Sequence, residues 1–232
     1  MNIVVCLHAP PPDPTGGSAL GRDDGFALSY ALTLASAPAG SHRVTALLAG
    51  SSAEVGPLQR ALVAGAERAV RLAGEDYRSA DFHTVGQALA AAIRRLAGDL
   101  VLTGARSDDE GLGAVPAATA RQLGFTYVAA VESIAPGSEA GTVEVVVRGG
   151  GRKRRLQVSL PAVLSVAAGP AQAPSPPDRT ANATVVEVLS LADPEATVVR
   201  RRTELLGRAE PASRGTQEVS SAAAFVTALA RR

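Results

Sequence analysis

The sequence has few of the residues that build disulfide-linked, metal-bound or aromatic-rich folds. Its 232 residues include one cysteine, Cys6, and no tryptophan, and aromatic residues make up only 3%. A single cysteine excludes an internal disulfide framework and fits a reducing compartment. The three histidines, His8, His42 and His83, lack the spacing of a metal site. We therefore expect no metal centre and a core built from Ala, Val and Leu.

Excess charge and long apolar runs are also missing. Lys and Arg total 23 and Asp and Glu total 22, so the net charge is +1, which gives no electrostatic reason to expect a nucleic-acid partner. No apolar run approaches the roughly 20 residues of a membrane-spanning helix. The first residues also lack the basic start of a signal peptide. These absences predict a cytoplasmic protein that is not inserted in a membrane.

The motifs of common enzyme chemistry are absent as well. The sequence contains no G-x-S-x-G, no Walker A lysine motif and no H-E-x-x-H. Nothing in it supplies a nucleophile with its base. We therefore expect no catalytic residue and no hydrolase or transferase activity. This suits a chain that binds a nucleotide as one part of a larger assembly.

The sequence does contain a regular alternation of short apolar runs and helical periodicity. The first helix is expected to begin at Asp23 or Asp24, either of which could cap it. Later helices are expected at about 54–64, at 80–96 and up to Gly124, and strands at 2–7, 43–49, 69–72 and 99–103. Four strand–helix units predict an α/β fold, with a Rossmann-like, mostly parallel sheet and helices on both faces.

The loop before the last of these helices is the strongest candidate site. The stretch VLTGARSDDEGLGAVPAATARQLG reads as a strand, a polar loop with Gly111 and Gly113, and a helix start. Free N–H groups at a helix N-terminus attract phosphate, and glycine lets the backbone approach it. The alternative interpretation is a solvated acidic loop in front of an ordinary capped helix. The residues alone leave both open.

After Gly124 the pattern changes to strands with little helix between them. Hairpin turns are expected at 135–137 and 149–151, and we interpret these strands as antiparallel ones appended to the parallel sheet. The basic run 152–155 would lie at a hairpin tip, either as a solvated tip or as a docking patch for an acidic partner. The expected strands are residues 126–134, 141–148, 152–159 and 162–166.

A Pro- and Ala-rich linker begins at Ala167 and leads to an extended C-terminal arm. The arm carries a short apolar segment, 185–191, and an amphipathic helix, 218–232, whose apolar face needs another surface. We therefore predict two parts. Residues 1–168 form an α/β nucleotide-binding domain, and residues 169–232 form a Pro-rich arm and C-terminal helix that packs on a partner subunit.

Several segments, in order, resemble the β subunits of electron-transfer flavoproteins, the family that includes the FixA proteins. They are NIVVCLHAPPPD, DDGFALSYALTLA, VTALLAG, LQRALVAGAERAVRL, DLVLTGARSDDEGLGAVPAATARQLG, LQVSLPAVLSV and VVEVLSLADP. The resemblance covers most of the chain. It identifies the chain as a divergent member of that family and implies an electron-transfer carrier subunit, not an enzyme.

The resemblance also implies cofactors, partners and a site. A β subunit of this family binds AMP as a structural nucleotide and helps to hold the FAD of an α subunit. The heterodimer carries electrons from a dehydrogenase to an acceptor. An FAD in the β pocket, as in bifurcating members, and a stand-alone adenine-nucleotide-binding protein are the alternatives. By matching position, the nucleotide-binding residues would be Cys6, Gly21, Arg22, Asp23, Asp24, Ala49, Gly104, Ala105, Arg106, Ser107, Asp108, Asp109, Glu110, Gly111, Leu112, Gly113, Ala114 and Val115.

The chain departs from the family pattern at three places that matter for these implications. His8-Ala9 stands where the family has Lys followed by Arg or Gln after the first strand. Gly111 replaces a Thr or Ser that would contact phosphate. The arm is Pro-rich over 171–178 where the family carries a dehydrogenase-docking segment, which implies a donor other than an ordinary acyl-CoA dehydrogenase.

Overall fold

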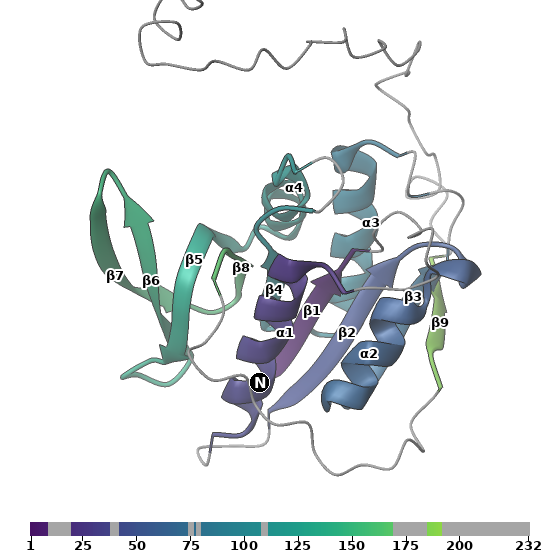
Figure 1. Ribbon diagram of the computed structural model, residues 1–232, viewed down its shortest axis with the longest axis horizontal. Helices are drawn as coiled ribbons and strands as arrows, with labels where there is room; N and C mark the ends of the chain where they lie inside the picture. The colour runs from purple at the N-terminus through teal and green to yellow at the C-terminus, as the bar shows by residue number, and fades with distance from the viewer. Residues whose placement is uncertain are drawn as a thin grey trace, which may run out of the picture. The chain divides into compact units, whose positions relative to one another are not determined.

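A nine-stranded sheet organises the part of the chain that the structure describes (Figure 1). The structure is a computed structural model, and it describes residues 1–8, 20–37, 42–73, 77, 80–107, 111–168 and 185–191. The strand order is β7-β6-β5-β8-β4-β1-β2-β3-β9. The strands are β1 (Asn2–Leu7), β2 (Arg43–Ala49), β3 (Arg68–Ala73), β4 (Leu100–Gly104), β5 (Thr126–Pro136), β6 (Thr142–Gly149), β7 (Arg152–Ser159), β8 (Ala162–Val166) and β9 (Glu187–Ser190).

The centre of the sheet is parallel, as the alternating pattern predicts. β1 pairs in parallel with β2 on one side and with β4 on the other, and β2 continues to β3. The chain therefore builds outward from β1 through β3 and then returns to place β4 against the opposite edge of β1. Such a reversal leaves a crevice at the carboxyl ends of the two strands, where α/β folds bind ligands. The Rossmann-like fold class is confirmed.

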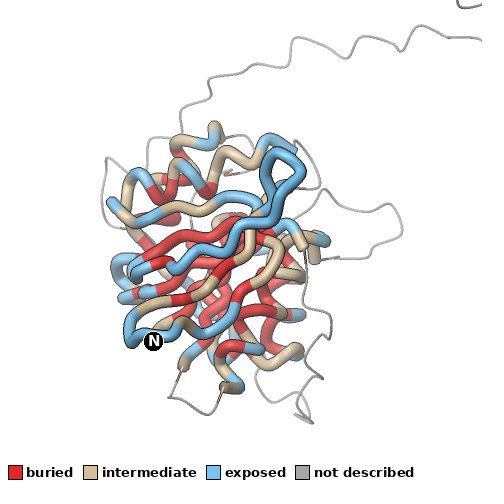
Figure 2. Tube along the Cα trace, turned by 90° about the vertical axis from the view of Figure 1, so that its left-hand side faces the viewer, coloured by how far each residue is buried: buried red, intermediate tan, exposed pale blue. Residues whose placement is uncertain are grey.

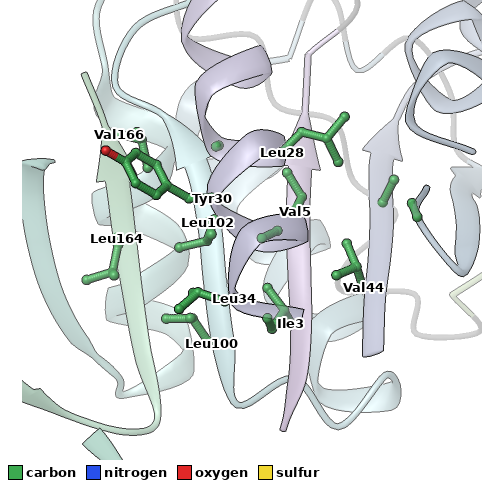
Figure 3. Close-up of a cluster of buried hydrophobic side chains, with 14 of the residues drawn as sticks. Ile3, Val5, Leu28, Tyr30, Leu34, Val44, Leu100, Leu102, Leu164 and Val166 are labelled. Atoms are coloured by element: carbon green, nitrogen blue, oxygen red, sulfur yellow. The ribbon is translucent and has the colours of Figure 1, made fainter. Parts of the chain in front are cut away.

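Helices cover both faces of this sheet because each central strand is apolar on both sides. Along β1, Ile3 and Val5 enter the core cluster that contains α1 and α2, whereas Val4 and Cys6 enter the one that contains α3 and α4. Figure 3 shows the first cluster, and in Figure 2 the buried stretches gather in the middle of the described part. The helices are α1 (Arg22–Ala35), a 3-10 turn η1 (Ser52–Glu54), α2 (Gly56–Ala64), α3 (Phe82–Arg95) and α4 (Ala114–Leu123).

The strands after α4 correct one prediction. β5–β6 and β6–β7 are antiparallel, as expected, and Gly150 and Gly151 form the tight turn between the latter two with φ of 58° and 74°. β8, however, lies between β4 and β5 and is parallel to both. The appended antiparallel strands are therefore present, but β8, which the sequence pattern groups with them, extends the parallel part, because apolar periodicity shows which faces are buried and does not choose the neighbouring strand.

β5 belongs to both the parallel and the antiparallel part of the sheet. Its first residues pair with β8, and its last residues pair with β6, with register shifts between Val128 and Val131 and between Val131 and Ser133. Ala130, inside the first shift, has a φ of 53°, and bulges of this kind bend a strand. The first hairpin turn consequently lies at residues 137–141, beyond the predicted 135–137.

Part of the predicted arm lies on this chain's own sheet. β9 pairs in parallel with β3, and Glu187 accepts two hydrogen bonds from the Arg68 guanidinium, at 2.9 and 2.7 Å. The remainder of the arm, including the predicted helix at 218–232, lies outside the described residues. The boundary at residue 168 and the packing of the arm on a partner therefore stay predictions. None of the described helices is long and apolar enough to cross a membrane.

Candidate functional site

A pocket opens at the carboxyl edge of the sheet, at the reversal between β1 and β4. Cys6 and His8 come from the end of β1, Ala49 from the end of β2, and Thr103 and Gly104 from the end of β4. The N-terminal turns of α1, α3 and α4 complete its wall. These strand ends meet only because the strands are parallel and adjacent, so the site is a direct product of the topology.

Asp24 joins the two strands on either side of the crevice. Its carboxylate accepts a hydrogen bond from the backbone N–H of His8 at 2.7 Å and another from the backbone N–H of Gly104 at 3.0 Å. The residue is only 7% exposed and lines the pocket. The prediction that Asp23 or Asp24 caps α1 was wrong, since Gly21 is the N-cap and no side chain caps this helix. The carboxylate reaches across to the strands instead.

Gly104 makes this contact possible because it has no side chain. A Cβ at this position would lie 2.5 Å from Oδ1 of Asp24 and 3.0 Å from its backbone nitrogen. The first distance is shorter than real Cβ contacts, and the second is tight and involves a backbone atom that cannot rotate away. Glycine as the last residue of β4 therefore lets the first turn of α1 pack this closely against the strand.

The N-terminus of α4 forms the next part of the wall. Gly113 is its N-cap, with a φ of 62°, and as a glycine it offers the first turn no side-chain acceptor. A Cβ at Gly113 would lie 2.6 Å from the carbonyl oxygen of Ala105. Pro116, at the third helical position, has no N–H to satisfy. The N–H groups of the first turn and the helix dipole are thus directed toward the pocket, an arrangement that favours an anion.

An apolar part of the wall comes from α3 and the loop before α4. Val85 and Leu89 lie one helical turn apart on α3 and line the pocket. Phe82 and Leu112 also line it and are 45% and 70% exposed, unusually high for large apolar side chains. Apolar walls with a few polar groups at one end are typical of small-molecule sites. The combination suits a ligand with a flat apolar ring and an anionic end.

Cys6 lines the pocket as an unreactive group. Burial and, to a smaller extent, the negative charge of Asp24 raise the pKa of its thiol to about 12. The thiol is therefore protonated at neutral pH, which agrees with its predicted role as a small buried apolar residue. No group of three or more His, Cys, Asp or Glu side chains that could hold a metal occurs among residues with described structure.

The structure brings half of the predicted nucleotide-binding residues together around this pocket. Those that line it are Cys6, Asp24, Ala49, Gly104, Ser107, Leu112, Gly113, Ala114 and Val115. Six others do not line it: Gly21, Arg22, Asp23, Ala105, Arg106 and Gly111. Arg22, for example, lies over the ring of Phe26, 5.5 Å from its centroid. Asp108, Asp109 and Glu110 lie outside the described residues. Which of these residues contact a nucleotide stays a prediction.

Sequence reasoning missed most of the apolar wall and one carboxylate. Glu54 reaches the pocket from η1, where its side chain also accepts a hydrogen bond from the backbone N–H of Ser51 at 2.8 Å. Val85 and Leu89 lie in the helix expected at 80–96, but helical periodicity does not tell which of its apolar residues face a pocket, and Tyr77 carried no signal. A capping-box pattern at Ser51–Glu54 could have located Glu54 beside the strand end. His8, which directly follows β1, also lines the pocket.

Comparison with known proteins agrees with this fold. A family profile described as "Electron transfer flavoprotein domain" matches residues 15–194. Protein FixA of Azorhizobium caulinodans is 33% identical over 149 residues, which cover 62% of this chain and 52% of the relative. The electron transfer flavoprotein subunit beta of Clostridium acetobutylicum is 33% identical over 148 residues, 58% of this chain and 56% of the relative.

A third relative shows the same extent of match. The electron transfer flavoprotein subunit beta of Methylophilus methylotrophus is 26% identical over 148 residues, 63% of this chain and 56% of the relative. The chain spans about half the length of the curated relatives it matches. Because the family profile covers most of the chain, from before α1 to beyond β9, this protein belongs to the electron transfer flavoprotein domain family.

Proposed function

We propose that this chain is the β subunit of a heterodimeric electron-transfer flavoprotein. In this role it binds AMP as a structural nucleotide and helps to hold the FAD of an α subunit. The heterodimer then carries electrons from a dehydrogenase to an acceptor. The family match supports the electron-transfer role, and the names of the relatives support the β-subunit assignment. The chain itself is a carrier subunit without a catalytic residue.

One observation carries the nucleotide part of the proposal: the pocket at the β1–β4 reversal ends on the N-terminus of α4, where the N-cap is a glycine, Gly113. The backbone N–H groups of Gly113, Ala114 and Val115 would hold the phosphate, because the cap residue leaves them without a side-chain partner. The apolar side chains of Val85, Leu89 and Leu112 would contact the adenine. The residues present thus fit a nucleotide with a phosphate at one end.

The chemistry divides between the two subunits. The FAD held mainly by the α subunit would accept and pass on the electrons. This chain's residues bind and orient, since Cys6, with its thiol pKa of about 12, supplies neither a thiolate nor a redox pair at neutral pH. Asp24 keeps the strand ends of β1 and β4 at fixed distance and so preserves the shape of the pocket.

The decisive experiment identifies the nucleotide that purifies with the protein. The chain is co-expressed with its α subunit, the complex is isolated and denatured, and the released nucleotides are quantified by mass spectrometry. We expect a yellow 1:1 complex that releases one AMP and one FAD. Two FAD per complex would indicate the bifurcating type, and ATP turnover by the isolated chain would indicate a stand-alone nucleotide-binding protein. A colourless monomer that ignores the α subunit would contradict the proposal.

We further propose that the arm beyond β9, up to residue 232, packs on the α subunit. The predicted amphipathic helix at 218–232 has an apolar face that needs a surface. Hydrogen exchange of the isolated chain and of the complex tests this. Slower exchange of amides in 218–232 on complex formation is expected, and equal exchange in both states would contradict it.

A further inference from the structure

The pocket at the β1–β4 reversal has an unusual charge for a phosphate site. Two carboxylates line it, those of Asp24 and Glu54, and no Lys or Arg among the described residues does. Sites for di- and triphosphates ordinarily place cations beside the phosphates, because each added phosphate brings further negative charge. Among the described residues, the backbone N–H groups at the start of α4 are the groups best placed to hold an anion.

Asp24 lies immediately beside the place where a phosphate would sit. Its Oδ1 accepts the N–H of Gly104 at 3.0 Å. The next residue, Ala105, directs its carbonyl oxygen at Gly113, so close that a Cβ there would lie 2.6 Å away. The carboxylate and the N-cap of α4 therefore contact two consecutive residues, Gly104 at the end of β4 and Ala105. A phosphate bound at the start of α4 would lie near this carboxylate.

We propose that Asp24 is a specificity-determining residue, which limits the ligand of this pocket to a nucleoside monophosphate. The inference rests on the proposed nucleotide site and adds which phosphate state the site accepts. The N–H groups of α4 and the helix dipole offset the charge of one phosphate group. A second or third group, extended along the crevice, brings more charge toward Asp24, in a partly buried setting where repulsion is weakly screened.

The two hydrogen bonds explain why Asp24 cannot move aside. The carboxylate is held by N–H groups from two different strands, at 2.7 and 3.0 Å. Rotation of the side chain away from an incoming phosphate would leave the buried N–H of Gly104 and the half-buried N–H of His8 without this acceptor, which is costly. The carboxylate is thus held in place at the pocket wall.

Equilibrium binding of AMP, ADP and ATP to the purified, nucleotide-stripped complex tests the proposal. Measurements are made in EDTA, because Mg²⁺ would neutralise the polyphosphates. We expect affinity to fall in the order AMP, ADP, ATP for the wild type, and Mg²⁺ to restore part of the ATP affinity. Equal affinities for the three would overturn the proposal without any variant.

The variant Asp24→Asn removes the charge and keeps one acceptor. We expect the ratio of the ATP to the AMP dissociation constant to fall about tenfold, the effect of an interaction worth about 1.4 kcal/mol. Glu144→Gln is the control, since it also removes one negative charge, on β6 and outside the lining of the pocket, and should leave the ratio unchanged. If Asp24 had only a structural role, Asp24→Asn would weaken the binding of AMP, ADP and ATP by the same factor, and that result would overturn the inference.

Failure of the inference is distinguishable from failure of the proposed function. If the wild type binds AMP and the ratio is the same in Asp24→Asn, the nucleotide site stands and the charge role is wrong. If the wild type binds no AMP, the proposed site is wrong and the inference falls with it. If circular dichroism shows that Asp24→Asn does not fold, the affinities of the wild type for AMP, ADP and ATP, measured with and without Mg²⁺, decide whether the inference holds.

Discussion

Replacing Gly104 with alanine is expected to destabilise the protein far more than the size of a methyl group suggests. The added Cβ would lie 2.5 Å from Oδ1 of Asp24, 3.0 Å from the nitrogen of Asp24 and 3.1 Å from Cβ of Asp23. Two of these atoms belong to the rigid first turn of α1 and cannot rotate away. The turn must therefore move from β4, and the hydrogen bond from Gly104 to Asp24 is lost or lengthened.

The magnitude follows from two effects. Losing a hydrogen bond to a charged acceptor costs about 1.5–3 kcal/mol, and overpacking at a site that cannot relax costs about 1–3 kcal/mol. We expect Gly104→Ala to lower the free energy of unfolding by about 3–5 kcal/mol, a large share of the roughly 5–15 kcal/mol of a typical domain. Urea denaturation followed by circular dichroism measures it.

Gly25→Ala is the matched control in the neighbouring helix. A Cβ there would meet only Cδ2 of Leu20, at an ordinary 3.8 Å, and alanine is the better helix former by about 0.5–1 kcal/mol. We expect this variant to be as stable as the wild type or slightly more so. If Gly104→Ala lowers the free energy of unfolding by less than about 1 kcal/mol, the close packing of α1 on β4 is refuted, irrespective of the stability of Gly25→Ala.

Three further outcomes are expected. Gly113→Ala should both destabilise the fold and weaken nucleotide binding, since its Cβ would meet the Ala105 carbonyl at 2.6 Å and its φ is 62°; urea melts and AMP titration measure the two effects. Cys6 should react with a thiol reagent only after unfolding, because burial raises its pKa to about 12. Glu187→Gln should cost no more than about 1 kcal/mol at pH 7, because the ion pair with Arg68 is about half exposed.

The pH dependence of the Glu187 effect has a definite sign. The hydrogen bonds from Arg68 lower the pKa of this carboxyl in the folded protein. Its contribution is therefore complete above the unfolded value, near 4.5, and disappears as the pH falls through the folded value. The stability difference between wild type and variant should vanish in acid, and a difference that grows there would contradict this assignment.

The control for the variant Gly113→Ala is Gly111→Ala. The φ of Gly111 is also positive, but a Cβ there would meet nothing closer than 3.8 Å.

Local sequence patterns were enough to predict the central fold. Short apolar runs, such as residues 2–7 and 43–49, alternate with helical periodicity, and this determines parallel strands with helices on both faces because a strand buried on both sides cannot show alternation. Gly113 and Gly124 bound α4 in the structure as predicted, each with a positive φ. These features depend on neighbours within a few residues.

Tertiary structure alone decided the strand neighbours and the wall of the pocket. The position of β8 between β4 and β5 and the addition of β9 beside β3 depend on pairings across many residues, which periodicity does not encode. Asp24 has the pattern of a helix cap, yet its carboxylate bonds the ends of β1 and β4, 16 and 80 residues away. Only the folded chain brings those two donors within reach of one side chain, and so only the structure assigns its role.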